Sequence, residues 1–436
     1  MSQPGPRTYY VLLAGQAVSF LGSQISGLAV GIAIFRQTGH ATPLALVSVF
    51  WTAPQVVLAG FGGLLADRFD RRRLMLAANL GYALSSALLL LSFASGGFQL
   101  WHLYALMLAN GVFAALEGPA FQSSITMLVP DSQRDRANAL AQFAFPTAIA
   151  LAAAAAGILY AAIGVTGAIE VDLLTFAGVI AVLALIRIPM PATTEAGAHS
   201  GGLLRQSLFG FGYLRARPGL LWLCLYIAVV QAVASGALVL MTPYVLDRVH
   251  STETFGIVVG VGNSGAIAGA LVMGAWGGTR PRMHTLMPSA VVIGLFMALA
   301  GVAREAAPIA IAFFLMSFAL PFANTTLNSI FQAKIAPDVQ GRVLAAIGQI
   351  GGVLAPAATL AAGPLADRVF ERAVGGAGWG SVAWLVGGQA GAGIGLMFAL
   401  AGALIAVATL VAYAHPAIRN LERALPDHTP DAAASA

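Results

Sequence analysis

The stretch Gly62-Gly63-Leu64-Leu65-Ala66-Asp67-Arg68-Phe69-Asp70-Arg71-Arg72-Arg73 joins two long apolar runs by a turn that is too charged to lie in lipid. The two glycines that open it allow neighbouring helix backbones to approach closely. Two acids and four arginines then follow within seven residues. Arginines beside an apolar run mark the side of the membrane on which a loop stays. The stretch therefore predicts a membrane protein and gives its loops a sidedness.

The composition supports a chain that lives in a lipid bilayer. Of its 436 residues, 58% are hydrophobic and 9% are charged, whereas a soluble globule carries about 25% charged residues. A spanning helix needs about 20 apolar residues, so the length allows about a dozen spans. Cys224 is the single cysteine, which excludes a disulfide within the chain. The basic residues are spread over short loops, which argues against a nucleic-acid partner.

Hydropathy predicts twelve spans, six on each side of one long polar connection. They lie at 9–35, 44–66, 74–95, 100–128, 138–162, 168–188, 218–246, 254–277, 285–303, 307–333, 342–364 and 388–414. The sequence thus predicts an all-α integral membrane protein with twelve transmembrane helices in two pseudo-symmetric six-helix bundles. The N-terminal bundle is expected at 1–189, a cytoplasmic linker at 190–217, the C-terminal bundle at 218–415 and a cytoplasmic tail at 416–436.

The distribution of basic residues predicts the orientation of these spans. Seventeen of the 22 Lys and Arg residues lie in the set of alternate loops that includes both termini and the Asp67 turn. Because basic loops stay on the cytoplasmic side, we expect both termini in the cytoplasm. The expected location is a bacterial-type cytoplasmic, or inner, membrane.

An internal repeat relates the two halves of the chain. Pro130-Asp131-Ser132-Gln133-Arg134-Asp135-Arg136 follows the fourth predicted span, and Pro337-Asp338-Val339-Gln340-Gly341-Arg342 follows the tenth. Self-similarity of this kind predicts two structurally related units. Tracing the repeat backwards from Pro130 and Pro337 places Glu117 opposite Asn324.

Glu117 is the acid that the sequence places deepest in the membrane. It lies 13 residues before Pro130, or about 20 Å at 1.5 Å per residue. No Lys or Arg lies at comparable depth, so we expect a carboxyl that is neutral when closed off from water. It is a candidate for proton coupling or for binding a cationic substrate group, and the alternative is a protonated glutamate bonded to a backbone carbonyl. Glu170 and Asp172 are expected at a solvated helix N-terminus on the outer surface.

Amide side chains provide the other candidates for proton coupling or substrate binding. They are Asn324, Asn110, Gln24, Gln231 and Asn263, although amides in membranes also serve simply to join helices. Gly260-Val261-Gly262-Asn263-Ser264-Gly265 fits a dinucleotide-binding pattern, but it lies in an apolar run and predicts helix packing instead. Since no phosphate-binding loop, nucleophilic triad or metal-ligand spacing is present, the sequence predicts neither an enzyme nor a cofactor or metal site.

The Asp67 turn resembles the loop between helices 2 and 3 of the major facilitator superfamily, whose pattern is G-x-L-a-D-R-x-x-R-R. Ala333–Arg342 and Gly363–Arg368 are similar to the same regions of its exporters, the group that includes enterobactin and macrolide efflux transporters. The resemblance implies alternating access around a substrate site between the halves, near the midplane. It implies export of a small amphiphilic molecule, such as a drug, natural product or siderophore, in exchange for protons. It also assigns a gating role to Gly63, Asp67, Arg68, Arg71, Arg72 and Arg136, with Asp67 as the latch, in a chain expected to be a monomer.

Departures from that pattern keep other functions open. Span 4 has no arginine, span 5 lacks a Gly-Pro pair, and Gly22-Ser23 stands where related exporters often have an acid after the glycine. An uptake carrier for a small metabolite is one alternative. Such a carrier would be expected to bind a polar nutrient with charged residues, and the predicted cavity offers one acid. The other is a membrane receptor or scaffold without transport, which would need neither the repeat nor a gate. The Asp67 turn would then be only a topological signal.

Overall fold

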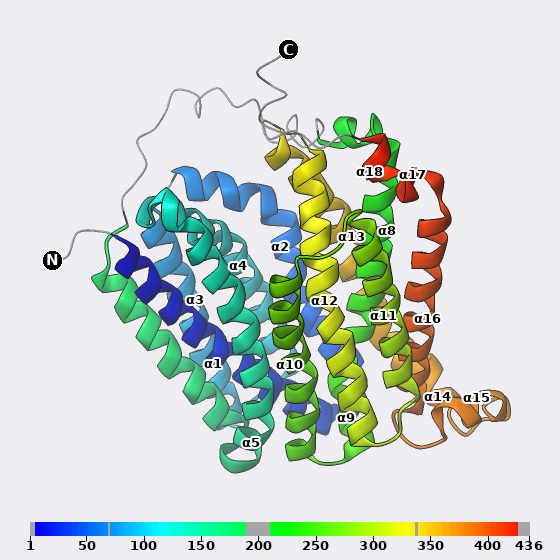
Figure 1. Cartoon of the computed structure of the whole chain (residues 1–436). Helices are drawn as coiled ribbons and strands as arrows, with labels where there is room; N and C mark the ends of the chain where they lie inside the picture. Colours follow the sequence, from blue (N-terminus) through cyan, green and yellow to red (C-terminus); the bar gives the residue numbers. More distant parts are fainter. Residues whose placement is uncertain (1–4, 69, 189–209, 336–338, 426–436) are drawn as a thin grey trace. The chain divides into compact units, whose positions relative to one another are not determined.

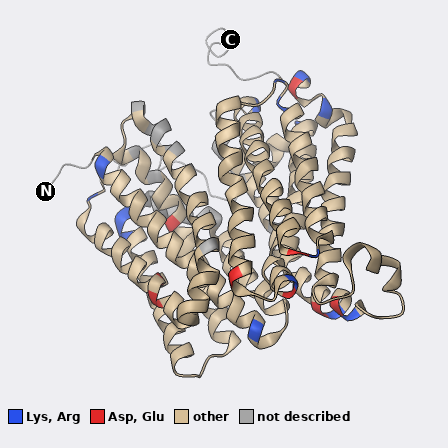
Figure 2. Ribbon diagram, turned by 60° about the horizontal axis from the view of Figure 1, so that its bottom comes forward, with Lys and Arg blue, Asp and Glu red and all other residues tan. Residues whose placement is uncertain are grey.

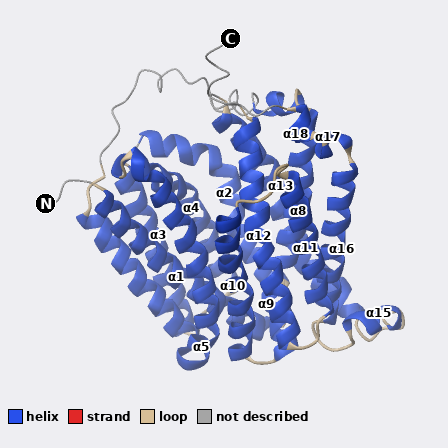
Figure 3. Cartoon of the chain, viewed as in Figure 1, coloured by secondary structure: helices blue, strands red, loops and turns tan. Residues whose placement is uncertain are grey.

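The computed structural model describes residues 5–68, 70–188, 210–335 and 339–425. Over these ranges the chain is almost entirely helical and contains no strand (Figure 1 and Figure 3). It divides into two compact units. The N-terminal unit comprises Met1–Thr194 with Val245–Gly260, and the C-terminal unit comprises Glu195–Tyr244 with Val261–Ala436. Most of the predicted linker, at 190–209, lies outside the described residues.

Five helices form most of the N-terminal unit. They are α1 (Pro6–Thr38), α2 (Thr42–Arg68), α3 (Arg71–Ala94), α4 (Leu100–Leu128) and α5 (Asp131–Leu185). The predicted fifth and sixth spans are the two parts of α5, which break at Gly164 with φ 70° and ψ −172°. Glycine adopts this conformation readily because it has no Cβ. Ala156 and Ala168, on either side of the break, pack in one cluster with Ala29 of α1, so the chain folds back there.

The C-terminal unit contains the remaining predicted spans. Its long helices are α8 (Pro218–Leu238), α10 (Thr252–Trp276), α11 (Met283–Val302), α12 (Ala306–Lys334), α13 (Gln340–Leu365) and α16 (Ala392–Ala414). Shorter ones are α9 (Met241–Val249), the π-helix η1 (Ala366–Phe370), α14 (Glu371–Ala373), α15 (Gly380–Val386), α17 (Pro416–Arg419) and α18 (Leu421–Ala424). The predicted seventh span is thus divided between α8 and α9. The end of α9 and the start of α10, at Val245–Gly260, belong to the N-terminal unit.

The spans predicted from hydropathy are confirmed. Among the described residues, ten helices are long and apolar enough to cross a membrane, and the shorter apolar helices Thr42–Leu58 and Phe143–Ala153 lie in two further predicted spans. The packing repeats with an offset of six spans. In the N-terminal unit α1 packs on α5, α3 on α4 and α3 on α5, and in the C-terminal unit α8 packs on α13, α11 on α12 and α11 on α16.

The helices are apolar on their outer and their packed faces alike. On α3 the side chains of Leu80, Leu84, Leu88 and Leu91 are exposed at intervals of three to four residues, which is one face of a helix. The opposite face buries Met75, Asn79 and Tyr82. Lys, Arg, Asp and Glu are sparse along the helices (Figure 2). This is the pattern of a bundle whose solvent is lipid.

Small residues let the helices approach closely in the C-terminal unit. A Cβ on Gly265 would lie 2.1 Å from the carbonyl oxygen of Phe314, and one on Gly269 would lie 2.1 Å from that of Phe318. Both contacts join α10 to α12 through the backbone. The interpretation of the Gly260–Gly265 pattern as helix packing is therefore confirmed.

The segment after α16 packs on the C-terminal unit. Ile418 and Leu421 are 2% and 1% exposed and join a buried cluster with Leu220 and Leu223 of α8. The Lys334 ammonium donates hydrogen bonds to the carbonyl oxygens of Glu422 (3.1 Å) and Leu425. The first part of the predicted tail at 416–436 is thus a packed element of this unit, because its apolar side chains fill a gap between helix ends.

Candidate functional site

Glu117 lies where α1, α3 and α4 meet in the N-terminal unit. Its Oε1 accepts a hydrogen bond from Gln16 Nε2 of α1 at 2.9 Å and from Asn79 Nδ2 of α3 at 2.5 Å. Tyr82, one turn after Asn79, provides a third side-chain hydrogen bond to the carboxyl. Among the described residues, the side chains that hydrogen-bond to Glu117 are thus all neutral. The sequence analysis also expected no cationic partner for this carboxyl, and its depth in the membrane stays a prediction.

The groups that hold Glu117 are themselves fixed by packing. Asn79 is 1% exposed and also donates to the carbonyl oxygen of Met75, 2.9 Å away. The Tyr82 ring is stacked on Phe176 of α5, with centroids 5.8 Å apart, and meets the Phe113 ring edge-on at the same distance. Side chains locked in this way hold a functional group in one geometry.

A second buried carboxyl in this unit corrects the sequence analysis. Asp172 of α5 is 4% exposed, whereas we predicted a solvated helix N-terminus. Its Oδ1 accepts a hydrogen bond from the Ser23 hydroxyl of α1 at 2.8 Å, and its Oδ2 accepts one from the Ser86 hydroxyl of α3 at 2.7 Å. The helical break lies at Gly164, so Asp172 is two turns inside the second part of α5. Glu117 is therefore not the only acid within the bundle.

The predicted amide candidates are not brought together with Glu117 by a described hydrogen bond. Asn110 of α4 is 8% exposed, and its Oδ1 has no hydrogen-bond partner among the described residues. Gln24 of α1 and Asn263 of α10 are half-buried, and Gln231 of α8 and Asn324 of α12 are exposed. The residues that the sequence analysis missed are Asn79, Tyr82 and Ser86 at intervals of three and four along α3, a spacing that places them on one helix face.

The described part of the predicted gate ties two helix ends together. Asp70 caps α3 by accepting hydrogen bonds from the backbone N–H groups of Arg72 (2.9 Å) and Arg73 (3.3 Å). The Arg72 guanidinium donates to the carbonyl oxygens of Leu183 and Ala184 at the end of α5, both at 2.6 Å. A cation is favourable at a helix C-terminus. Arg71 is buried. The surroundings of Gly63 and the side chains of Asp67, Arg68 and Arg136 lie outside what the structure describes.

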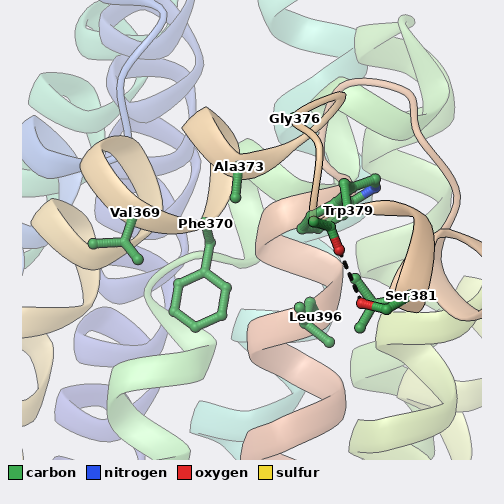
Figure 4. A pocket seen from close by; sticks show the side chains of 9 residues that line it. Val369, Phe370, Ala373, Gly376, Trp379, Ser381 and Leu396 are labelled. Carbon is green, nitrogen blue, oxygen red and sulfur yellow. Dashed lines mark hydrogen bonds between the residues drawn. The ribbon is translucent and has the colours of Figure 1, made fainter.

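A pocket of about 380 Å³ lies in the C-terminal unit among η1, α14, α15 and the start of α16 (Figure 4). Phe370, Leu396 and Val382 give it an apolar lining. Its two polar side-chain groups already have backbone partners, since the Trp379 indole donates to Gly387 (2.8 Å) and the Ser381 hydroxyl to Gly378 (2.9 Å). The pocket therefore offers no free polar side chain to orient a ligand. Within the described ranges, no group of three or more His, Cys, Asp or Glu side chains could hold a metal ion.

Comparisons with known proteins agree with this architecture. Macrolide efflux protein A of Streptococcus pyogenes is 24% identical over 364 residues, which cover 83% of this chain and 90% of that protein. YfiS of Bacillus subtilis, described as an uncharacterized MFS-type transporter, is 27% identical over 354 residues, covering 77% of this chain and 81% of that one. A crystal structure of a bacterial homolog of the human lysosomal transporter Spinster, inward-facing and unoccupied, shares the fold. It has a TM-score of 0.69 and 17% identity, and the match covers 98% of this chain and 99% of that chain.

The family follows from a match across most of the chain. The family model of the Major Facilitator Superfamily matches residues 12–359, a range that runs from α1 into α13 and includes Gln16, Asn79 and Glu117. The chain therefore belongs to the Major Facilitator Superfamily of multi-pass membrane transporters.

Proposed function

We propose that this protein is a secondary active exporter of a small amphiphilic molecule, driven by proton antiport across a bacterial cytoplasmic membrane. Glu117 is the proton-binding carboxyl in this proposal. Its support is one observation, namely that a carboxyl inside a helix bundle is held by Gln16, Asn79 and Tyr82 with no cation among its described partners. A buried carboxylate without a cationic partner is costly in a membrane. The carboxyl is therefore expected to hold a proton in a conformation that closes it off from water and to release the proton in one that opens it to water.

The neighbours of Glu117 suit both protonation states. A carboxylate accepts hydrogen bonds from the amide N–H groups of Gln16 and Asn79, whereas a carboxylic acid needs an acceptor for its own proton. Each neighbouring amide also carries a carbonyl oxygen that can take this role. The carboxyl can thus gain and lose a proton while it keeps its place, which links its charge to the alternation between two conformations.

The direction and the substrate class rest on sequence similarity. Macrolide efflux protein A is an efflux protein by name and aligns over 83% of this chain. A macrolide is therefore the first probe, and drugs, natural products and siderophores form the wider substrate class. In the proposed orientation both termini and the Asp67 turn face the cytoplasm, because most Lys and Arg residues lie in that set of loops. The Arg72 contact with the end of α5 then belongs to the cytoplasmic gate.

The test is transport by purified protein in liposomes under an imposed pH gradient, with a radiolabelled macrolide as the probe. Wild-type protein is expected to move the macrolide against its gradient when protons flow the opposite way. Glu117→Gln keeps the shape and removes the titration, so gradient-driven transport should fall steeply. Glu170→Gln is the matched control, since Glu170 is exposed on α5. It should transport like the wild type.

Two results would overturn parts of this proposal. Gradient-driven transport by Glu117→Gln at the wild-type rate would show that Glu117 is structural. Movement of the macrolide in the same direction as the protons would identify an uptake carrier. Exchange of labelled for unlabelled macrolide without a pH gradient distinguishes the two roles of Glu117. It should persist in Glu117→Gln if the carboxyl serves protons alone and fail if it also binds the substrate.

A further inference from the structure

We propose that Asp172 is a second proton-binding site of the N-terminal unit, formed with Ser23 and Ser86 and separate from the Glu117 cluster. This inference rests on the proposed proton antiport for its transport consequence. The site itself rests on geometry, because both oxygens of a 4% exposed carboxyl are engaged by hydroxyl groups from two other helices. A buried carboxylate without a cation is as costly here as at Glu117.

The two clusters use the same faces of the same two helices. On α1 the Glu117 partner is Gln16 and the Asp172 partner is Ser23, seven residues later. On α3 the corresponding pair is Asn79 and Ser86, again seven residues apart. Seven residues are two helical turns, or about 10 Å along the axis. The clusters are therefore stacked along the bundle, with Asp172 farther from the Arg-rich end of α3.

Hydroxyl groups suit a carboxyl that changes its charge. Ser23 and Ser86 each donate to the carboxylate in the arrangement described. When Asp172 takes up a proton it becomes a donor, and one serine hydroxyl turns over to accept the new O–H. The proton comes from water, the hydrogen bond that this hydroxyl donated is replaced by the one it accepts, no covalent bond breaks, and release reverses the step. A lysine or arginine partner, which can only donate, would hold the carboxylate ionised.

Close helix packing supports the Asp172 cluster. A Cβ on Gly22 would lie 2.2 Å from Thr175 Oγ1, so α1 and α5 are in contact one residue before Ser23. The Thr175 hydroxyl donates to the backbone carbonyl oxygen of Asp172 at 2.7 Å. Because α1 and α5 are already in contact here, the Ser23 hydroxyl of α1 is held at hydrogen-bonding distance from the Asp172 carboxyl of α5.

The titratable groups around Asp172 are few. Glu170 precedes it by two residues and is exposed, while Tyr82 of α3 and Glu117 of α4 belong to the neighbouring cluster. α1 contributes no acid, and among the described residues only Ser23 and Ser86 hydrogen-bond to the Asp172 carboxyl. Phe176, one turn after Asp172, stacks on Tyr82. Among the described residues the two carboxyls share no hydrogen-bond partner, so each is expected to bind its own proton.

The direct test is an infrared pH titration of the purified protein in liposomes, which needs no substrate. The C=O stretching band of a protonated carboxylic acid reports each buried carboxyl separately. Wild-type protein is expected to show two such titrating components, of which Asp172→Asn loses one and Glu117→Gln the other. Glu170→Gln should keep both. In Ser86→Ala the Asp172 component should remain and move in frequency, because the band reports hydrogen bonding to the carboxyl.

A reciprocal exchange controls for damage to the fold. Ser23→Asp combined with Asp172→Ser moves the carboxyl across a 2.8 Å hydrogen bond from α5 to α1. The exchange variant should regain the component that Asp172→Asn loses. An unchanged titration in Asp172→Asn would overturn the inference, whether or not the protein transports. Loss of the component in the wild type only when sodium is present would also overturn it, because that result indicates a sodium site. If the titration succeeds and macrolide transport fails, the proposed substrate is wrong and the second proton site stands.

The transport consequence is a change in stoichiometry. With Glu117 and Asp172 both coupled, wild-type protein should move two protons for each substrate molecule, measured from the pH gradient that just balances a substrate gradient. Asp172→Asn should move one. Two protons per substrate in Asp172→Asn would show that Asp172 binds a proton outside the transport cycle and would overturn its coupled role.

Discussion

Replacing Gly22 by alanine tests the contact that positions Ser23 against Asp172. The new Cβ would lie 2.2 Å from Thr175 Oγ1, 3.0 Å from its Cγ2 and 3.1 Å from its Cβ. Because non-bonded heavy atoms pack at about 3.5 Å from each other, the new Cβ and Thr175 Oγ1 must move apart by roughly 1.3 Å. Either Thr175 rotates and gives up its hydrogen bond to Asp172, or α1 moves away from α5 and takes Ser23 with it.

The size of the effect follows from two opposing contributions. Overpacking of this kind costs about 1–3 kcal/mol, whereas alanine gains about 1 kcal/mol over glycine in a helix. The net loss of folding free energy is therefore up to about 2 kcal/mol. For a domain of about 150–250 residues, each kcal/mol lowers Tm by about 2–4 °C. Gly22→Ala should lower the Tm by a few degrees, measured by intrinsic fluorescence of purified protein in one detergent.

Two further variants make this result specific. Gly27→Ala is the matched control on the same helix, because a Cβ there meets nothing within 4 Å, and its Tm should rise. Thr175→Ala removes the two side-chain atoms nearest to the clash, so the double variant Gly22→Ala/Thr175→Ala should recover most of the lost Tm. Equal Tm values for Gly22→Ala and Gly27→Ala would refute the reasoning, as would a double variant that shows no recovery.

Three other predictions concern contacts on both units. Arg72→Ala should destabilise the protein by about 1–2 kcal/mol, because two carbonyls at the end of α5 lose a charged donor. The Arg73 side chain is 87% exposed, so the control variant Arg73→Ala should leave the Tm unchanged. Equal losses of Tm in the two variants would contradict the contact between Arg72 and the end of α5. Gly265→Val should abolish folded protein on size-exclusion chromatography, since its Cβ would overlap a backbone oxygen at 2.1 Å, whereas Gly274→Val, with nothing within 4 Å, should fold. Lys334→Met should speed carboxypeptidase digestion into α18, and digestion at the wild-type rate would show that the two carbonyl contacts of Lys334 do not hold this segment.

The spans could be predicted from the sequence because lipid demands about 20 apolar residues wherever a helix crosses it. The connections were predicted less well. The sixth span was expected to start at 168 from hydropathy alone, but α5 breaks at Gly164, where the backbone has a positive φ. That difference of one turn is what moved Asp172 from the expected surface to a buried position. Hydropathy does not report where a helix turns back.

The partners of Glu117 could not be predicted for a different reason. In a soluble helix the polar face shows how the helix is rotated, but α3 is apolar on its exposed face as well as on much of its packed face. Its rotation about its own axis is therefore hidden in the sequence. The spacing of Asn79, Tyr82 and Ser86 was the available signal, since polar groups inside a membrane face the bundle interior. Depth along the helix, by contrast, could be counted from the sequence, and that count is what made Glu117 a candidate.

The packed segment after α16 also sets an order in biosynthesis. Leu421 contributes to the same buried cluster as Leu220 of α8, although two hundred residues separate them in translation. Membrane helices are inserted one after another as the ribosome proceeds. After its insertion, α8 therefore lacks the packing of Leu421 against this cluster until the last part of the chain is made. A chaperone or the insertion machinery has that interval in which to protect it. The C-terminal unit can close this end only after residue 421 has been made and has reached the membrane surface.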